Sequence, residues 1–199
     1  MKRLSWRLFG VAVLLGCAGV ARADVADFAI DPAHTHIAFG IDRFGFARTL
    51  GGLTLSEGTI RFDPNDISST EVTATLPVSS LHTALAERDH ILLGPHWLSA
   101  SEWPVIRFES TKVRRAASDG CPQQCYVVAG LLTVKGAAAP IQLDVVLNRV
   151  GTDPVSGREA LGASASVSLS RAAFGIDIAA GKIGDAIDVQ LEVLAIATD

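Results

Sequence analysis

The chain has no apolar run long enough to cross a membrane as a helix. The run at its N-terminus, Leu8 to Val20, has thirteen residues, whereas a membrane-spanning helix needs about twenty. Basic residues precede this run and Ala21-Arg22-Ala23 follows it, which is the layout of an export signal with a small-x-small cleavage site. We therefore expect residues 1–23 to be a removable signal peptide, residues 24–199 to be one mature domain, and the protein to be exported to the periplasm.

A second interpretation of the same N-terminus stays open. Leu14-Leu15-Gly16-Cys17 resembles a lipobox, in which Cys17 would become the lipidated first residue of an outer-membrane lipoprotein. Leu15 fits such a motif poorly, because a small or β-branched residue is usual at that position. Both interpretations take the protein out of the cytoplasm.

The mature part also lacks a run of basic residues and has few thiols. Cleavage after Ala23 would remove four basic residues and no acidic one, taking the formal net charge from −4 to −8. Without a basic patch, we expect no nucleic-acid partner. Cys121 and Cys125 are expected to form a disulfide at a hairpin tip in an oxidising compartment. A redox-active pair is a weaker alternative, because three residues separate the two cysteines instead of two.

Motifs of common enzymes are absent as well. The nearest match to a G-x-S-x-G elbow, Gly162-Ala163-Ser164-Ala165-Ser166, fails at its last residue. The glycine pair Gly51-Gly52 lacks the spacing and the following helix of a phosphate-binding loop. We therefore expect no enzymatic activity and no cofactor. His34 and His36 would share one face of a strand, which leaves metal binding as a minor alternative without a third ligand at a diagnostic spacing.

What the chain does have is a regular alternation of apolar and polar residues, which is typical of half-buried strands. The alternating stretches are 31–42, 59–63, 72–78, 105–109, 126–134, 141–148, 163–169 and 187–193. Turn signals such as Lys135-Gly136 separate them. One segment, Thr83 to Leu93, has helical spacing instead and ends at Gly94-Pro95. The pattern predicts an all-β fold of about eight antiparallel strands with one short helix, and leaves open whether it is a sandwich or a barrel.

A series of longer motifs runs in order from Asp31 to nearly the last strand. The series is Asp31-Pro32-x-His34-Thr35-x-Ile37-x-Phe39, Gly58-x-Ile60-x-Phe62-Asp63, Ser80-Leu81-x-Thr83, Arg88-Asp89, Pro104-x-Ile106-x-Phe108-x-Ser110, Gly130-x-Leu132-Thr133-Val134-x-Gly136, Arg171-x-x-Phe174-Gly175 and Gly184-Asp185-x-Ile187. Together these motifs resemble the YceI-like family of exported, lipocalin-like, polyisoprenoid-binding proteins. The resemblance implies an eight-stranded antiparallel lipocalin-like barrel, and a role for His34 in pinning the opening loop.

The chain also departs from that family at one end of the expected barrel. Arg43-Phe44-Gly45 stands where the family usually has His-Leu-Gly, and His96-Trp97-Leu98-Ser99 where it has Asp-Phe-Phe-Asp. The identity of the ligand is therefore not carried over from the family.

The predicted function is that of an exported, non-enzymatic carrier of a long-chain amphipathic lipid, either a polyisoprenoid or an isoprenoid quinone, held inside the barrel. The expected apolar lining is Ile37, Phe39, Ile41, Phe44, Phe46, Phe62, Leu76, Leu81, Leu92, Trp97, Trp103, Ile106 and Phe108. Arg43, Arg88 and Arg171 are candidates to contact an anionic head group through their guanidinium forks.

The alternative is a structural or interaction module whose core is filled with side chains. Its partner would be another protein or a membrane surface. A transient membrane contact and a homodimer also stay open for the carrier.

Overall fold

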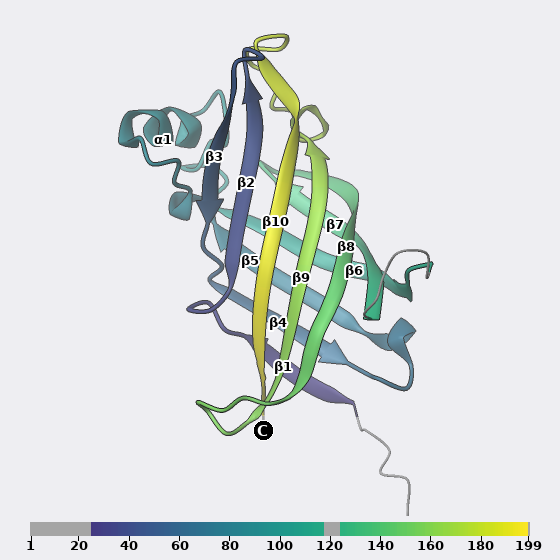
Figure 1. Ribbon diagram of the computed structural model, residues 1–199. Helices are drawn as coiled ribbons and strands as arrows, with labels where there is room; N and C mark the ends of the chain where they lie inside the picture. The colour runs from purple at the N-terminus through teal and green to yellow at the C-terminus, as the bar shows by residue number, and fades with distance from the viewer. Residues whose placement is uncertain (1–24, 118–123, 199) are drawn as a thin grey trace, which may run out of the picture.

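A computed structural model of the chain describes residues 25–117 and 124–198. The predicted signal peptide, Cys17 and Cys121 lie outside these residues. Within them, ten strands form one antiparallel sheet in the order β1-β4-β5-β6-β7-β8-β9-β10-β2-β3. A further pairing of β1 with β10 closes eight of these strands, β1 and β4 to β10, into a barrel (Figure 1). The prediction of an all-β, eight-stranded barrel with one short helix is confirmed.

The strands are β1 (Ala26–Ile30), β2 (His36–Arg43), β3 (Ala47–Leu53), β4 (Glu57–Phe62), β5 (Glu71–Pro77), β6 (Val105–Arg115), β7 (Gln124–Val134), β8 (Ala137–Thr152), β9 (Glu159–Ser170) and β10 (Ile183–Ala197). Three 3-10 helices, η1 (Ile67–Ser69), η2 (Val78–Ser80) and η3 (Arg171–Phe174), and the α-helix α1 (Ala86–Leu93) lie between them. The helix predicted over 83–93 begins three residues later than expected. None of the described helices is long and apolar enough to span a bilayer.

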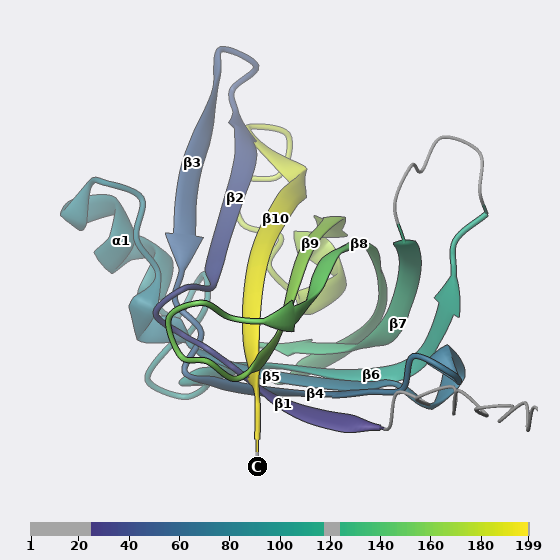
Figure 2. The same cartoon turned by 60° about the horizontal axis from the view of Figure 1, so that its bottom comes forward.

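The strands that close the barrel are not all those expected from the sequence. The predicted opening strand, now β2, pairs with the first part of β10, where Phe39 faces Val189. The last residues of β10 pair instead with β1, where Ile30 faces Ala195. The β2–β3 hairpin therefore stands outside the closed ring, beside β10 (Figure 2). The pattern missed β1 because it is only five residues long, and β3 because Gly51-Gly52 interrupts its alternation.

The loop between β1 and β2 is held by the His34 ring, as expected. Its Nδ1 donates to the Asp31 carboxylate at 2.7 Å. This bond lowers the pKa of Asp31 below its ordinary value, and a hydrogen bond from the backbone N–H of Ala33 adds a smaller effect in the same direction. The contact keeps the loop closed where the chain passes from the ring to the hairpin.

Glycines on the inner face make room for aromatic rings on neighbouring strands. A Cβ atom added to Gly130 on β7 would lie 2.5 Å from the backbone oxygen of Glu109 and 2.5 Å from the ring of Phe108, both on β6. Real Cβ atoms do not approach other atoms so closely, so Phe108 keeps its buried position only while residue 130 has no side chain.

We expect the substitution Gly130→Ala to lower the free energy of unfolding by about 1 to 3 kcal/mol, because it overpacks this contact. Urea denaturation measures the change. Gly162→Ala on β9 is the matched control, because the nearest atom to its added Cβ is 4.0 Å away. That variant should be unchanged or slightly more stable, as expected when a glycine is replaced without strain. Equal losses in both variants would contradict the packing argument.

Candidate functional site

The inner face of β8, β9 and β10 is an apolar wall that the core does not fully cover. Each residue of this inner wall is only half-buried. The inner wall consists of Ile141, Leu143, Val145, Leu147, Val167, Leu169, Ile187, Val189, Leu191 and Val193. Their outward neighbours on β10, such as Asp188 and Gln190, are exposed and polar. All of them except Val167 and Ile187 also pack against the buried core, so the wall lies at its edge.

The opposite side of the ring is packed. Phe28, Ile60, Leu76, Phe108 and Leu132, on β1 and β4 to β7, are all less than 10% exposed. They face the interior, since the registers pair Phe28 with Ile60 and Phe108 with Leu132. The residues of β1 and β4 to β7 are therefore more deeply buried than those of the inner wall.

The inner wall continues onto the β2–β3 hairpin. Phe39 and Ile41 are half-buried and lie beside Val189 and Ile187 of β10. A Cβ atom on Gly51 of β3 would fall inside the contact distance of the Phe39 ring, so that ring lies across the glycine. The apolar surface thus extends from the ring toward the end of the hairpin.

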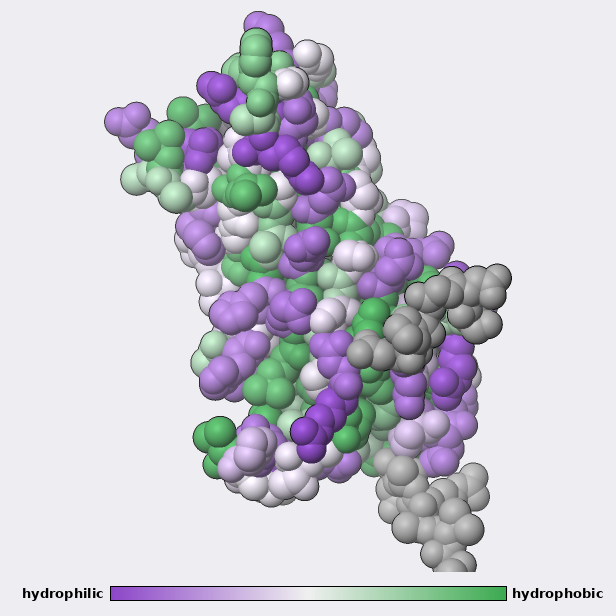
Figure 3. Space-filling model, in the orientation of Figure 1, coloured by the Kyte–Doolittle hydropathy of each residue, from purple (hydrophilic) through white to green (hydrophobic). Residues whose placement is uncertain are grey.

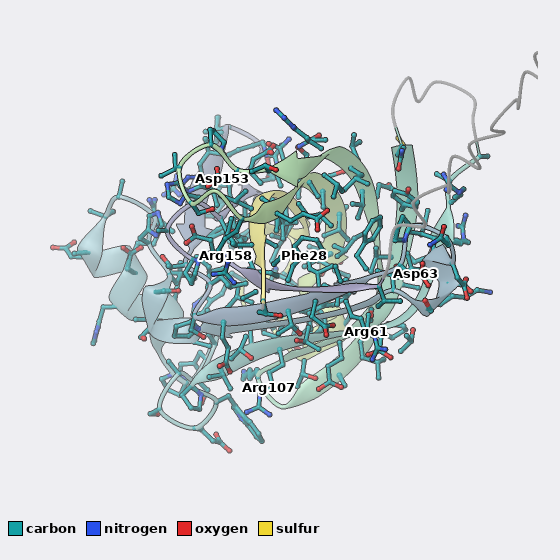
Figure 4. The ribbon with its side chains drawn as sticks, turned by 90° about the horizontal axis from the view of Figure 1, so that it is seen from below. Phe28, Arg61, Asp63, Arg107, Asp153 and Arg158 are labelled. Atoms are coloured by element: carbon teal, nitrogen blue, oxygen red, sulfur yellow. The ribbon has the colours of Figure 1, made fainter. Side chains whose placement is uncertain are left out.

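A cavity of about 500 Å³ opens at the end of the barrel opposite the hairpin turn. Its lining is Ala26, Phe28, Phe62, Pro64, Gln124, Leu147, Asn148, Arg149, Val150 and Glu159. Figure 4 views the molecule from this end and places Phe28 near the centre, with Asp153 and Arg158 on the β8–β9 connection to one side. Phe28, Phe62 and Leu147 give the cavity an apolar floor beneath a polar rim. Its volume lies within the range of small-molecule pockets.

A second groove of about 340 Å³ lies beside α1. It is lined by His90, Ile91, Gly94, Pro95, His96, Trp97 and Ile178. Trp97 packs against the core, and its ring centroid lies 5.7 Å from the guanidinium carbon of Arg171.

The predicted lining residues fall into three groups. Those on the inner face of ring strands or of β2 are Ile37, Phe39, Ile41, Phe62, Leu76, Ile106 and Phe108. Those in the connection from η2 to β6 are Leu81, Leu92, Trp97 and Trp103; Leu81 is buried, whereas Trp103 is 40% exposed. Phe44 and Phe46 do not line the barrel. They lie in the β2–β3 turn with 46% and 91% of their surface exposed, because the strand ends at Arg43.

Sequence reasoning missed most of the inner wall, although its alternation was visible. The search for a lining favoured aromatic residues, and the described parts of β8, β9 and β10 carry aliphatic ones. The signal that would have found the wall is the length of these strands, from twelve to sixteen residues.

The three head-group candidates have different surroundings. Arg171 is 3% exposed and donates to the carbonyl oxygens of Ile176, Ile178, Ile183 and Gly184 at 2.7 to 3.1 Å. The Arg88 guanidinium donates to the hydroxyl and the carbonyl of Thr83 at the start of the helical segment. Arg43 is exposed at the β2–β3 turn, stacked on Phe44. We assign Arg171 and Arg88 to holding their own loops.

The remaining candidates concern metal and redox chemistry. His36 lies on the outer face of β2, opposite Glu192, and no group of three or more metal-ligating side chains forms within residues 25–117 and 124–198. Cys125 is the second residue of β7, and its expected partner Cys121 is outside the described residues, so the disulfide stays a prediction.

Comparisons with known proteins agree with this architecture. The family model described as YceI-like domain matches residues 28–195. A UPF0312 protein of Pseudomonas aeruginosa is 31% identical over 186 residues, covering 92% of this chain and 94% of the relative. The protein YceI of Escherichia coli O17:K52:H18 is 29% identical over 184 residues, covering 92% of each chain.

Two solved structures share the fold. BcnA of Burkholderia cenocepacia superposes with a TM-score of 0.71 at 19% identity, covering 83% of this chain and 98% of BcnA. A polyisoprenoid-binding domain of Saccharophagus degradans gives a TM-score of 0.62 at 12% identity, covering 88% of this chain and all of that domain. With a family match over nearly the whole barrel, the chain belongs to the YceI-like family.

Proposed function

We propose that the protein is an exported, non-enzymatic carrier that holds a long-chain amphipathic lipid, a polyisoprenoid or an isoprenoid quinone, against the inner wall of β8, β9 and β10. The observation that carries this proposal is the half-buried apolar wall inside a ring whose other side is packed. The binding named for the Saccharophagus degradans domain is consistent with it.

The size of the wall suits a hydrocarbon chain. From Ile187 to Val193 a strand spans about 20 Å at roughly 3.3 Å per residue, and neighbouring strands widen the surface. Burial contributes about 0.8 kcal/mol per CH₂ group, so about twenty carbons contribute up to ~16 kcal/mol before the costs of association. Apolar burial alone is therefore sufficient for tight binding, without a catalytic or metal-ligating group.

Native mass spectrometry of the protein purified from its producing cell tests the proposal. We expect an added mass that matches an isoprenoid lipid, or uptake of an isoprenoid quinone offered in solution. An unliganded mass combined with no uptake would overturn the carrier function. The same spectra test export, because cleavage after Ala23 and lipidation of Cys17 give different masses.

The substitution Val167→Phe distinguishes a hollow barrel from a filled core. Val167 is half-buried on β9 and pairs with Val189. If the space beside the wall is empty, the larger ring is tolerated and lipid uptake falls or shifts to shorter chains. A filled core would instead lose about 1 to 3 kcal/mol of stability through overpacking. Urea denaturation and native mass spectrometry of the same sample separate the two results.

A further inference from the structure

The turn between β2 and β3 presents two phenylalanine side chains to solvent. Phe46 is 91% exposed and Phe44 is 46% exposed. Figure 1 shows this turn at the end of the molecule opposite the C-terminus, and Figure 3 shows hydrophobic atoms there, next to strongly hydrophilic ones. An apolar side chain with most of its surface in water adds little to the stability of the fold. We therefore expect Phe44 and Phe46 to contact another molecule.

The backbone of the turn is strained to hold these side chains. The Phe46 N–H donates to the Arg43 carbonyl at 3.1 Å, and the two residues between them, Phe44 and Gly45, have φ values of +57° and +69°. Turns with two positive φ values favour Asn-Gly or Asp-Gly. A phenylalanine in the left-handed region costs free energy, so the geometry of the turn does not explain the presence of this residue type.

Two cations flank the phenylalanines. The guanidinium carbon of Arg43 lies 4.6 Å from the centroid of the Phe44 ring. The carbonyl of Lys182 accepts the Phe44 N–H at 2.8 Å, which joins the loop before β10 to the turn. Among the described residues, neither Arg43 nor Lys182 has a carboxylate within ion-pair distance. The neighbouring Asp42 carboxylate accepts the Gly45 N–H at 2.9 Å.

We propose that Arg43, Phe44, Phe46 and Lys182, which we call the aromatic turn, dock the protein on an anionic lipid bilayer. Exposed aromatic side chains enter the boundary between head groups and acyl chains, while adjacent cations meet lipid phosphates. The formal charge of the whole chain is −4, whereas Arg43 and Lys182 place two positive charges beside the exposed phenylalanines against one negative charge from the Asp42 carboxylate.

The shape of the aromatic turn favours a membrane over a second copy of the chain. A stable protein interface buries about 800 Å² on each partner, whereas one phenylalanine supplies about 150 to 250 Å². A narrow turn with two phenylalanines can insert into a fluid bilayer, but it offers too little area for a stable interface with a second protein. If the proposed function is correct, docking would also turn toward the bilayer the part of the apolar surface that Ile41 and Phe39 add to the inner wall.

Sedimentation with vesicles of phosphatidylglycerol or phosphatidylcholine tests the docking. We expect the parent protein to bind phosphatidylglycerol vesicles, and Phe46→Ser to weaken that binding about tenfold or more. Val155→Ser is the matched control, because Val155 is 93% exposed in the β8–β9 connection and should have no effect. Replacing Arg43 and Lys182 together with glutamine should weaken binding to phosphatidylglycerol about tenfold, and added salt should remove that difference.

Any of three results would overturn the docking proposal. The first is that the parent protein does not bind phosphatidylglycerol vesicles, and the second is that Val155→Ser weakens binding as much as Phe46→Ser. The third is that sedimentation velocity shows the parent to be a dimer that Phe46→Ser converts to a monomer. Lipid uptake from detergent solution by the Phe46→Ser variant should equal that of the parent. A failure of docking can therefore be distinguished from a failure of the carrier function. All variants are compared only after intact mass shows the same N-terminus.

Discussion

Replacing Arg171 with methionine is expected to lower the free energy of unfolding by about 3 to 5 kcal/mol. The Arg171 side chain is 3% exposed, and its guanidinium binds four carbonyl oxygens between Ile176 and Gly184. Each hydrogen bond to a charged group contributes about 1.5 to 3 kcal/mol, and the total loss is smaller than the sum over four bonds because water can replace part of them at the freed carbonyls. Methionine fills much of the same volume but leaves these carbonyls without donors, so the connection from η3 to β10 loses its anchor.

Arg48→Met is the matched control for this experiment. Arg48 donates to the Asp188 carboxylate at 2.7 Å and to the Gly40 carbonyl at 2.9 Å, but the side chains of the ion pair are 51% and 54% exposed. An exposed ion pair contributes at most about 1 kcal/mol. Urea denaturation of both variants measures the difference. If Arg171→Met is no more destabilising than Arg48→Met, the four bonds do not hold the connection and Arg171 returns as a candidate for a head-group contact.

The substitution Arg171→Lys tests whether the stability depends on the positive charge of the guanidinium or on its planar shape. The single ammonium group of lysine has three donors on one nitrogen, whereas Arg171 reaches the carbonyls of Ile176, Ile183 and Gly184 from three different nitrogens. We therefore expect Arg171→Lys to lose most of the stability that Arg171→Met loses. A lysine variant as stable as the parent would mean that the positive charge matters here and the fork does not.

The family resemblance implied closure into a barrel, and the alternation of side chains was sufficient to predict strands β4 to β10, because most of them pack one face inward and leave the other in water. The alternation was not sufficient to predict which segment closes the ring. β1 and β2 share the partner β10, and the division between them depends on the loop at Asp31, whose hydrogen bond to His34 leaves no trace in hydropathy. The motif around His34 indicated the loop but not the change of partner that follows it.

The site was harder to predict, because the exposed fraction of an inward-facing side chain depends on which side chains face it from the opposite side of the ring. Val189 and Leu76 look alike in the sequence, since both are inward-facing aliphatic residues in alternating strands. Leu76 is buried, whereas Val189 is half-buried. That difference arises from the rings of Phe28, Phe62 and Phe108 on one side of the barrel and is a property of the closed structure. Phe44 and Phe46 show the opposite error, because aromatic character alone placed them inside.

Replacing Val189 with glutamate is expected to lower the affinity for an isoprenoid lipid at least about a hundredfold. Val189 lies in the middle of the inner wall, with Val167 on one side and Phe39 on the other. In the empty barrel the new carboxylate has access to water, because this position is half-buried. A bound hydrocarbon would remove that water and leave the charge without a partner, so the substitution weakens binding far more than folding.

Gln190→Glu introduces the same residue one position further along β10, on the outer face, where Gln190 is exposed between Ser166 and Ala38. It should bind lipid as the parent does, and both variants are compared by quinone uptake in native mass spectrometry. Val189→Thr, which keeps the shape of valine, provides a milder test if Val189→Glu fails to fold, and it should weaken binding by about three- to tenfold. Uptake unaffected at position 189 but lost at position 190 would place the ligand on the outside of the barrel. Because adjacent residues of a strand point to opposite faces, this pair tests directly whether the lipid lies inside the ring.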